Sequence, residues 1–490
     1  MFLLLACVAR SDDDHPADTA DTPAGPADIA TPSVGWFRGD LHFHTNYSDD
    51  AVEQGGDWMA GALAIADAWR DPAWVGANPD LSPDDHLQFI AVTDHRTTAG
   101  LSDPDFGHPY LAVLGGEEFG SDGHAGIWGI REHIPHEPQR GESPSQRIVD
   151  AMAEAHAQGG LFSINHPLYS GDLWVWPTDD IDAVEVWNGP WATFAAETDA
   201  ATLVGLLAAT GVSGDPALTA AVDHAGSGQN AQALRMWQGL LSQGHHVPVV
   251  GGSDRHMLLP AGLPTTYVAA ATSGDILAGL AAGSTFVSRS PQGPQLLLSA
   301  EVDGVTWPMG AALPAGARTA TVTWTAARAD GGLVRLVGGP VDSGLPEPEV
   351  LATIEVTGAL ASGTWTWTVP ATGGWLHGVL IDPLPEVPAG AEAAVDVLST
   401  FPDGGGVEAL VGALLPLVDT STLGDPVSCD PATWDPGRLG CMPADDQPLG
   451  SYYIPTTLQP WFSVEYTDRT PTGYAMGAIT SAFFVPVADP

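Results

Sequence analysis

The 490-residue chain contains no lysine, so arginine supplies all 15 of its basic side chains against 60 acidic ones. The formal net charge of −45 would repel a phosphate backbone, because nucleic-acid affinity rests mainly on basic contacts. The sequence also lacks any uninterrupted apolar run of about 20 residues, which excludes a multi-span membrane protein. At about 150 residues per domain, the length corresponds to about two or three domains. We expect no nucleic-acid partner.

Cysteine is scarce, with three residues in the whole chain. Cys7 ends a short apolar run and looks like the lipid-attachment cysteine of a bacterial lipoprotein. Six residues, none of them basic, precede it, so we interpret residues 1–7 as a signal remnant and expect the true start to lie upstream. A chance apolar start is the alternative. Cys429 and Cys441 could close a small loop in an oxidising compartment or remain two surface thiols.

Residues 8–34 are rich in aspartate and proline, a composition that cannot form a core. We expect a disordered acidic linker that tethers an exported protein in the cell envelope, in the periplasm or at the outer surface. Contact with the membrane would then occur only through a lipid at Cys7.

Two patterns of hydrophobicity divide the rest of the chain. Residues 35–290 alternate short apolar runs with helical stretches, which predicts an α/β domain. The runs expected to be buried parallel strands are 89–92, 111–114, 161–164, 183–186 and 247–250, and the expected helices lie near 57–70, 145–158, 230–243 and 274–282. Several runs end in Asp, Glu or His, as in a barrel or open sheet whose active site lies at the carboxyl ends of its strands.

Residues 291–490 favour a β-sandwich. Residues 319–325 and 364–369 alternate at period two and are rich in Thr, Val and Trp. We expect an irregular insertion at about 385–460 and a closing strand within 475–487. This domain could bind glycan or simply pack on the first one.

Histidine is the informative residue, because 14 of the 16 lie between residues 35 and 290. His42 and His44 are two positions apart in a predicted strand, so both imidazoles share one face and can reach one ion. Further His and carboxylate residues follow later strands, namely Asp94, His95, Glu117, Glu118, His124, His166, Asp254 and His256. Each alone could be a core or capping residue, but together they converge on one rim. Without thiolates, the set suits a hydrolytic cluster of Zn²⁺, Mn²⁺ or Fe²⁺.

The order of these motifs resembles the PHP (polymerase and histidinol phosphatase) superfamily of metallohydrolases. The motifs are Asp-x-His-x-His at 40–44, Thr-Asp-His at 93–95, Gly-x-Glu at 116–118, Asn-His-Pro at 165–167 and Ser-Asp-x-His at 253–256. Glu117-Glu118 followed by Gly123-His124, and the stretch 184–188, are most similar to the CehA/McbA (carbaryl-hydrolase-like) branch. The resemblance covers about residues 36–335 and implies a distorted (β/α)7 barrel with two or three divalent metal ions.

The resemblance also implies how the ligands divide. His42, His44, Glu118 and Asp254 would hold one metal, and Glu118 would bridge to a second held by His124 and His166. His95 and His256 would hold a third, with Asp49 at a position where many relatives have a ligand. Glu117 is the alternative to Glu118, but the spacing of Glu118 from Gly116 matches the Gly-x-Glu motif and favours Glu118. The related amidohydrolases often bridge metals through a carboxylated lysine, which this chain lacks, so a glutamate bridge is required.

The predicted chemistry is attack of a metal-activated hydroxide on a small-molecule ester. Asp94 would orient a ligand or relay a proton, and Arg96 and Arg255 would grip a phosphate or offset local negative charge. Phosphoester hydrolysis is the preferred reaction. Hydrolysis of a carbamate, carboxylic ester or amide is the first alternative, and a non-catalytic, metal-containing envelope binding protein is the second. Between residues 44 and 95 a long insertion carries Trp58, Trp69 and Trp74, which could cover a substrate or pack on the barrel.

Overall fold

The computed structural model describes residues 35–48, 59–67, 86–120, 123–169, 173–189, 205, 215–222, 229–255, 261–342, 344–383 and 474–487. The strands are β1 (Gly35–Phe43), β2 (Phe89–Val92), β3 (Ala112–Phe119), β4 (Ala125–Trp128), β5 (Leu161–Ile164), β6 (Ala183–Asn188), β7 (Val249–Gly252), β8 (Thr265–Ala270), β9 (Thr285–Ser288), β10 (Gln295–Val302), β11 (Val305–Pro308), β12 (Thr319–Ala327), β13 (Leu333–Pro340), β14 (Glu349–Glu355), β15 (Leu360–Thr368), β16 (Gly374–Pro383), β17 (Tyr474–Thr480) and β18 (Phe483–Val485). The α-helices are α2 (Met59–Ala66), α4 (Pro144–Ala157), α7 (Pro216–Val222), α8 (Gln229–Gln243) and α9 (Ile276–Ala281), and short 3₁₀ turns span Ala99–Ser102 and Ser273–Asp275.

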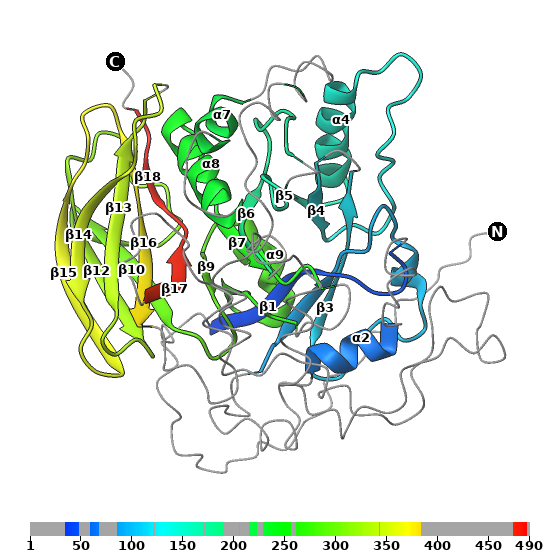
Figure 1. Ribbon diagram of the computed structural model, residues 1–490, viewed down its shortest axis with the longest axis horizontal. Helices are drawn as coiled ribbons and strands as arrows, with labels where there is room; N and C mark the ends of the chain where they lie inside the picture. Colours follow the sequence, from blue (N-terminus) through cyan, green and yellow to red (C-terminus); the bar gives the residue numbers. More distant parts are fainter. Residues whose placement is uncertain are drawn as a thin grey trace, which may run out of the picture.

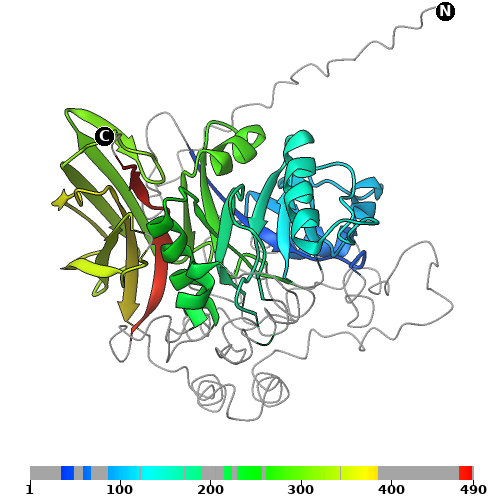
Figure 2. The same cartoon turned by 90° about the horizontal axis from the view of Figure 1, so that it is seen from above.

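The fold is mixed α/β and is dominated by one 14-stranded sheet (Figure 1). Its strand order is β14-β13-β16-β17-β9-β8-β1-β2-β3-β4-β5-β6-β7, and β18 pairs with β16. A second sheet has the order β11-β10-β12-β15. Viewed from above, the C-terminal strands lie on one side of the molecule and α4 on the other (Figure 2).

The strands from β1 to β7 are parallel at four of their six junctions. β1–β2, β2–β3, β5–β6 and β6–β7 pair in parallel, as the buried apolar runs predicted. β4 is different, because it runs antiparallel between β3 and β5. This strand was not predicted, because its four residues include a glycine. The seven-fold repeat of strand and helix is therefore not evident in the described residues.

The chain returns to its first strand after β7. Phe43 at the end of β1 forms a parallel bridge with Arg255, and His44 N–H donates to Arg255 C=O at 3.0 Å. Asp254 N–H donates to His42 C=O at 2.9 Å. These bonds place the segment that follows β7 beside the two histidines of β1.

Helix α4 shows how the local sequence fixes an element and its packing. Ser143 caps its start by accepting the Gln146 N–H, and Pro144 occupies the first turn, where its missing N–H costs nothing. A stripe spaced three and four residues apart then faces the core. It consists of Ile148, Ala151, Met152 and Ala155, which join Phe162 of β5 in one buried cluster.

Strand β12 buries one of its two faces. On β12, Ala320, Val322 and Trp324 are buried while Thr319 and Thr321 are exposed, which confirms the alternation in the sequence. The buried side chains share one hydrophobic core with Val334 and Leu336 of β13, Leu376 and Leu380 of β16, and Trp367 of β15. The four-stranded sheet therefore packs face to face against this end of the large sheet.

Helix α8 lies between these C-terminal strands and β6 (Figure 1). Every residue from Gln229 to Ser242 is buried, including several polar ones. Trp237 Nε1–H donates to the Val247 carbonyl at 2.9 Å, and Gln238 bonds His377 of β16. Helix α8 thus contacts both β16 and β6.

Some expectations fall outside the described residues, namely the signal remnant 1–7, the linker 8–34, the insertion 385–460, the cysteine pair and the three tryptophans between residues 44 and 95. None of the helices in the described part of the chain is both long and apolar enough to cross a membrane. The strands expected at 111–114 and 247–250 are displaced to Ala112–Phe119 and Val249–Gly252. Both run further toward the polar residues that follow them.

Candidate metal centre

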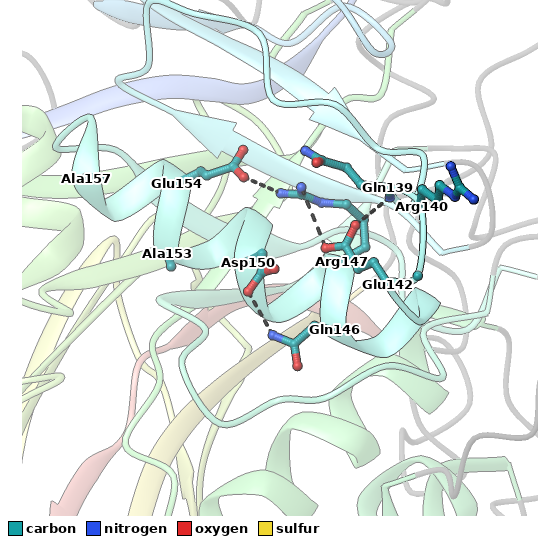
Figure 3. Close-up of a pocket in the computed structure, with 10 residues that line it drawn as sticks. Gln139, Arg140, Glu142, Gln146, Arg147, Asp150, Ala153, Glu154 and Ala157 are labelled. Atoms are coloured by element: carbon teal, nitrogen blue, oxygen red, sulfur yellow. Dashed lines mark hydrogen bonds and ion pairs between the residues drawn. The ribbon is translucent and has the colours of Figure 1, made fainter.

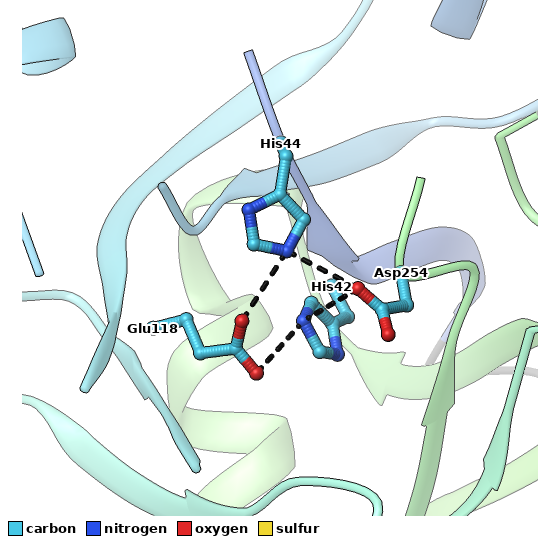
Figure 4. Close-up of side chains that lie close together, drawn as sticks. All are labelled: His42, His44, Glu118 and Asp254. Atoms are coloured by element: carbon cyan, nitrogen blue, oxygen red, sulfur yellow. Dashed lines mark ion pairs between the residues drawn. The ribbon is translucent and has the colours of Figure 1, made fainter. Parts of the chain in front are cut away.

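Four side chains from three strand ends meet at one point, three of them buried and that of Asp254 partly exposed. His42 and His44 belong to the end of β1, Glu118 to β3, and Asp254 follows β7. One ligand atom from each lies within 4.8 Å of the others (Figure 4). His42 Nε2 is 3.1 Å from Glu118 Oε1 and 3.3 Å from Asp254 Oδ1, and His44 Nε2 is 3.3 Å from the same Asp254 oxygen.

Glu118 is shared with a second group of donors. His95 Nδ1 lies 3.2 Å from Glu118 Oε2, and His124 Nδ1 lies 3.4 Å from Glu118 Oε1. A parallel bridge between the backbones of His95 and Glu118 fixes this approach. His166 Nε2 is 3.1 Å from Glu118 Oε1, so the carboxylate has imidazoles on several sides. Both oxygens of Glu118 can therefore serve different ions.

Glu117, the neighbour of Glu118, faces away from this cluster because successive strand residues point to opposite sides. Its Oε2 lies 2.6 Å from His133 Nδ1, and its Oε1 accepts the Ile134 N–H at 2.9 Å. The structure therefore places Glu118, rather than Glu117, among the candidate ligands.

The charges in this site shift the pKa values in opposite directions. Burial disfavours the charged imidazole of His42, but the carboxylates of Glu118, Asp254 and Glu185 raise its pKa well above the usual range. Burial also disfavours the charged imidazole of His44. Contacts with Asp254 and Glu118 outweigh this effect and raise the pKa of His44 to about 9. Burial opposes ionisation of Glu118 as well, but the surrounding histidines lower its pKa well below the usual range.

The donor set fits divalent metal ions. Among the described residues, His42 Nε2 and Glu118 Oε2 are buried and make no hydrogen bond of good geometry. A buried polar atom without a partner costs about 1–3 kcal/mol, and a metal ion would satisfy both atoms. Imidazole nitrogens with carboxylate oxygens are the ligands that Zn²⁺, Mn²⁺ and Fe²⁺ share. Binding would displace the protons that the imidazoles hold without metal.

Ser48 contacts His44 and His95 on the side away from the candidate ligand atoms, and Asp94 contacts Ser48. Ser48 Oγ lies 2.8 Å from His44 Nδ1, donates to Asp94 Oδ1 at 3.1 Å, and accepts the His95 N–H at 3.0 Å. Asp94 also accepts from Thr45 N–H at 2.6 Å and from Thr45 Oγ1–H at 2.8 Å. Since Ser48 gives its only proton to Asp94, His44 carries a proton on Nδ1 and directs Nε2 to the cluster.

Asp94 thus lies behind two candidate ligands, through its contact with Ser48. The carboxyl is 1% exposed and burial raises its pKa. Its two oxygens are directed to Thr45 and Ser48.

Glu185 holds two other histidines and was not predicted as a functional residue. Its Oε1 lies 3.1 Å from His42 Nδ1, and its Oε2 accepts the His166 N–H at 2.9 Å. Asn165 Nδ2–H donates to Glu118 Oε1 at 3.0 Å. A glutamate between two valines in a fully buried strand was the signal that could have identified Glu185.

Asp40 connects the strand ends that carry the ligands. One oxygen accepts the N–H groups of His42 and Ser253, and the other accepts the Gly262 N–H at 2.7 Å. Arg96, His166 and Asp254, with φ angles of 52°, 23° and 49°, adopt left-handed backbone conformations. Such conformations cost about 1–3 kcal/mol each and cluster at functional sites.

Two predicted arginines occupy different settings. Arg96 is half-buried and its Nη1–H donates to the Gly120 carbonyl at 3.2 Å. Arg255 is 2% exposed, with its guanidinium carbon 5.4 Å from the ring centre of Phe43. Phe43 alternates with His42 and His44 on β1 and faces the opposite side. Two further predicted ligands, Asp49 and His256, lie outside the described residues.

A pocket of about 650 Å³ lies along the outer side of α4 (Figure 3). Arg147 pairs with two of its carboxylates. Its Nη2 lies 2.8 Å from Glu154 Oε1, and its Nη1 lies 3.8 Å from Glu142 Oε1. Gln146 Nε2–H donates to Asp150 at 2.8 Å. None of the candidate metal ligands lines this pocket.

A scan against protein-family models finds no match for this chain, and no curated protein matches it. Among solved structures, the crystal structure of PsfC from Pseudomonas syringae PB-5123 has 14% sequence identity and a TM-score of 0.25, over 48% of this chain and 82% of that chain. A TM-score that low supports no inference about fold or function.

Proposed function

We propose that the protein is a metal-dependent hydrolase of small-molecule esters, with phosphoesters as the preferred substrate class. The main support for this proposal is the convergence of four side chains whose donor atoms lie within 4.8 Å of one another, namely His42, His44, Glu118 and Asp254. Glu118 also belongs to the group formed with His95 and His124. A structural metal site closes around four donors, whereas a carboxylate shared by two groups suits a multinuclear hydrolytic centre.

The architecture that we propose with this function is a distorted barrel of the PHP type over residues 35–290, followed by a β-sandwich over residues 291–490. The bridge between Phe43 and Arg255 supports closure of the barrel, because it joins the segment after β7 to β1. The ligands lie at or just beyond strand ends, as barrel active sites do.

The chain's own residues hold the candidate ligands in place in this proposal. Two or three divalent ions held here would polarise the ester and make water more acidic. Ser48 and Asp94 keep the Nδ1 proton of His44 in place, so that Nε2 remains available as a ligand. Glu185 does the same for His42.

Arg96 is the candidate for binding an anionic group of the substrate. It follows His95 directly and its side chain is partly exposed, with Nη1 bonded to the carbonyl of Gly120. A guanidinium can bind phosphate oxygens in a bidentate manner. Arg255 supports the local fold instead, because its guanidinium is buried against Phe43.

The buried position of Arg255 also favours a second candidate, hydrolysis of a neutral carbamate, carboxylic ester or amide. With Arg255 directed to Phe43, one of the two predicted guanidiniums remains for a phosphate. A chain of net charge −45 also disfavours anionic substrates over neutral ones. The reaction centre would be the same.

The test is turnover of an aryl phosphate monoester, a phosphate diester, an aryl carbamate and an aryl acetate by Mn²⁺- or Zn²⁺-loaded full-length protein. His42→Ala and Glu118→Ala should abolish the turnover, and His156→Ala, a change of an exposed histidine on α4, should not. Phosphate turnover supports the first candidate, and carbamate or acetate turnover supports the second. Absence of turnover on every substrate by metal-loaded protein would contradict both.

We also propose that the protein is exported and anchored in the cell envelope through a lipid on Cys7. The support is the lipobox-like start and the acidic segment that follows it. Labelled palmitate should be incorporated into the full-length protein and not into a Cys7→Ser variant. Equal labelling of both proteins would contradict the proposal.

A further inference from the structure

The second residue of helix α8, Asn230, is an asparagine that is bonded to the main chain of β6. Asn230 Oδ1 accepts the Asn188 N–H at 3.1 Å, and Asn230 Nδ2–H donates to the Asn188 carbonyl at 3.2 Å. Both residues are almost fully buried, at 4% and 1% exposure. The side-chain amide therefore fixes both polar groups of one peptide position, at the residue where β6 ends.

The side chain of Asn188 in turn reaches the metal centre. Its Nδ2 donates to Glu185 Oε2 at 3.0 Å and to Asp254 Oδ2 at 3.2 Å. Glu185 contacts His42 Nδ1 and the His166 N–H. A single amide thus lies behind three candidate ligands, His42, His166 and Asp254.

We infer that Asn230, Asn188 and Glu185 form a positioning chain that holds one half of the metal centre, the half built on His42 and Asp254. The inference rests on the proposed metal-dependent function and adds residues that lie behind the candidate ligands. His166 and Asp254 both have left-handed backbones, which persist only where surrounding bonds over-determine them. The chain supplies such bonds, because Asp254 accepts from Asn188 and His166 N–H donates to Glu185.

The other half of the centre has a separate support. His44 and His95 contact Ser48, and Ser48 donates to Asp94. None of the hydrogen bonds found among the described residues joins Ser48 or Asp94 to Glu185 or Asn188. Loss of the α8 contact should therefore weaken the ion at His42 and Asp254 more than an ion at His95, whose contact with Ser48 does not involve α8.

The experiment is a stepwise Co²⁺ titration of metal-free full-length protein, followed by the absorbance of the bound ion and by calorimetry without substrate. Asn230→Ala should weaken one binding event by about 10- to 100-fold, the usual effect of losing support behind a ligand. That event should be the one missing in His42→Ala and retained in His124→Ala. Gln238→Ala, on the same helix but bonded to His377, is the matched control and should leave every binding event unchanged.

Asn188→Leu gives a second reading if Asn230→Ala does not fold, because it retains the main-chain contact with Asn230 and removes the donor to Glu185 and Asp254. Unchanged affinity in either folded variant, or equal weakening of all binding events, would overturn the positioning chain. Wild-type protein that binds Co²⁺ but hydrolyses none of the esters would contradict the proposed function and leave this inference standing. Wild-type protein that binds no Co²⁺ would overturn both.

Discussion

The raised pKa values of histidines in the candidate metal centre lead us to expect that metal-free protein becomes less stable as the pH rises. The pKa of His44 is raised to about 9, so its folded form binds a proton more tightly than the unfolded chain, whose histidines titrate near 6.5. The resulting stabilisation is fully present below pH 6.5 and is lost as the pH rises to 9. At 1.36 kcal/mol per pKa unit, about 3 kcal/mol of unfolding free energy disappears over this window. His42 and His166, whose pKa values are also raised, add to the loss.

Metal reverses the direction of this dependence. Each ion must displace protons from the imidazoles, so at pH 7 His44 alone weakens the apparent metal affinity by about 50-fold relative to pH 9. The assay is urea unfolding of chelator-treated and Zn²⁺-loaded protein at pH values from 6.5 to 9, with proton release measured by calorimetry in two buffers. Metal-free stability that stays flat or rises over this range, or binding at pH 7 without proton release, would refute the reasoning.

Three further predictions concern single side chains. Glu185→Gln should weaken one metal by about 10- to 100-fold, measured by chelator competition, and unchanged affinity would contradict its role behind His42. Burial lowers the pKa of His377 to about 3, so the unfolding free energy is unaffected by this group above pH 6.5 and falls by about 2 kcal/mol at pH 5. His377→Gln should therefore make denaturant unfolding less sensitive to acid. An identical pH dependence in the variant would argue against a neutral buried imidazole. Trp367→Ala should cost about 3–5 kcal/mol in the core between the sheets, and a loss below 1 kcal/mol by urea unfolding would show that this core is loosely packed.

Local pattern predicted those parts of the fold in which one segment determines its own structure. The apolar run 161–164 is β5 at the same bounds, and the alternating Thr and Trp residues form β12 and β15. The two histidines of β1 share a face because strand side chains repeat with period two. By contrast, β4 was missed because its four residues include a glycine, and its antiparallel direction depends on its neighbours β3 and β5.

The candidate site shows the same division. Ligand types at strand ends pointed to His42, His44, Glu118 and Asp254, and these four converge in the structure. The residues behind them depend on contacts across the fold. Asn230 is 42 positions from Asn188, and Glu185 is 143 positions from His42, so no local spacing joins either pair. The environment of Arg255 likewise depends on Phe43, far away in the sequence.

The most direct test of the central claim is the metal content of purified full-length protein, measured by mass spectrometry after loading with Zn²⁺ or Mn²⁺ and removal of free ions. Wild type should retain at least two ions per chain, and Glu118→Gln should lose at least one together with ester hydrolysis. Glu117→Gln, the neighbouring buried carboxylate that faces His133, should retain both. Wild type without bound metal, or Glu118→Gln with full metal content, would contradict a Glu118-bridged centre.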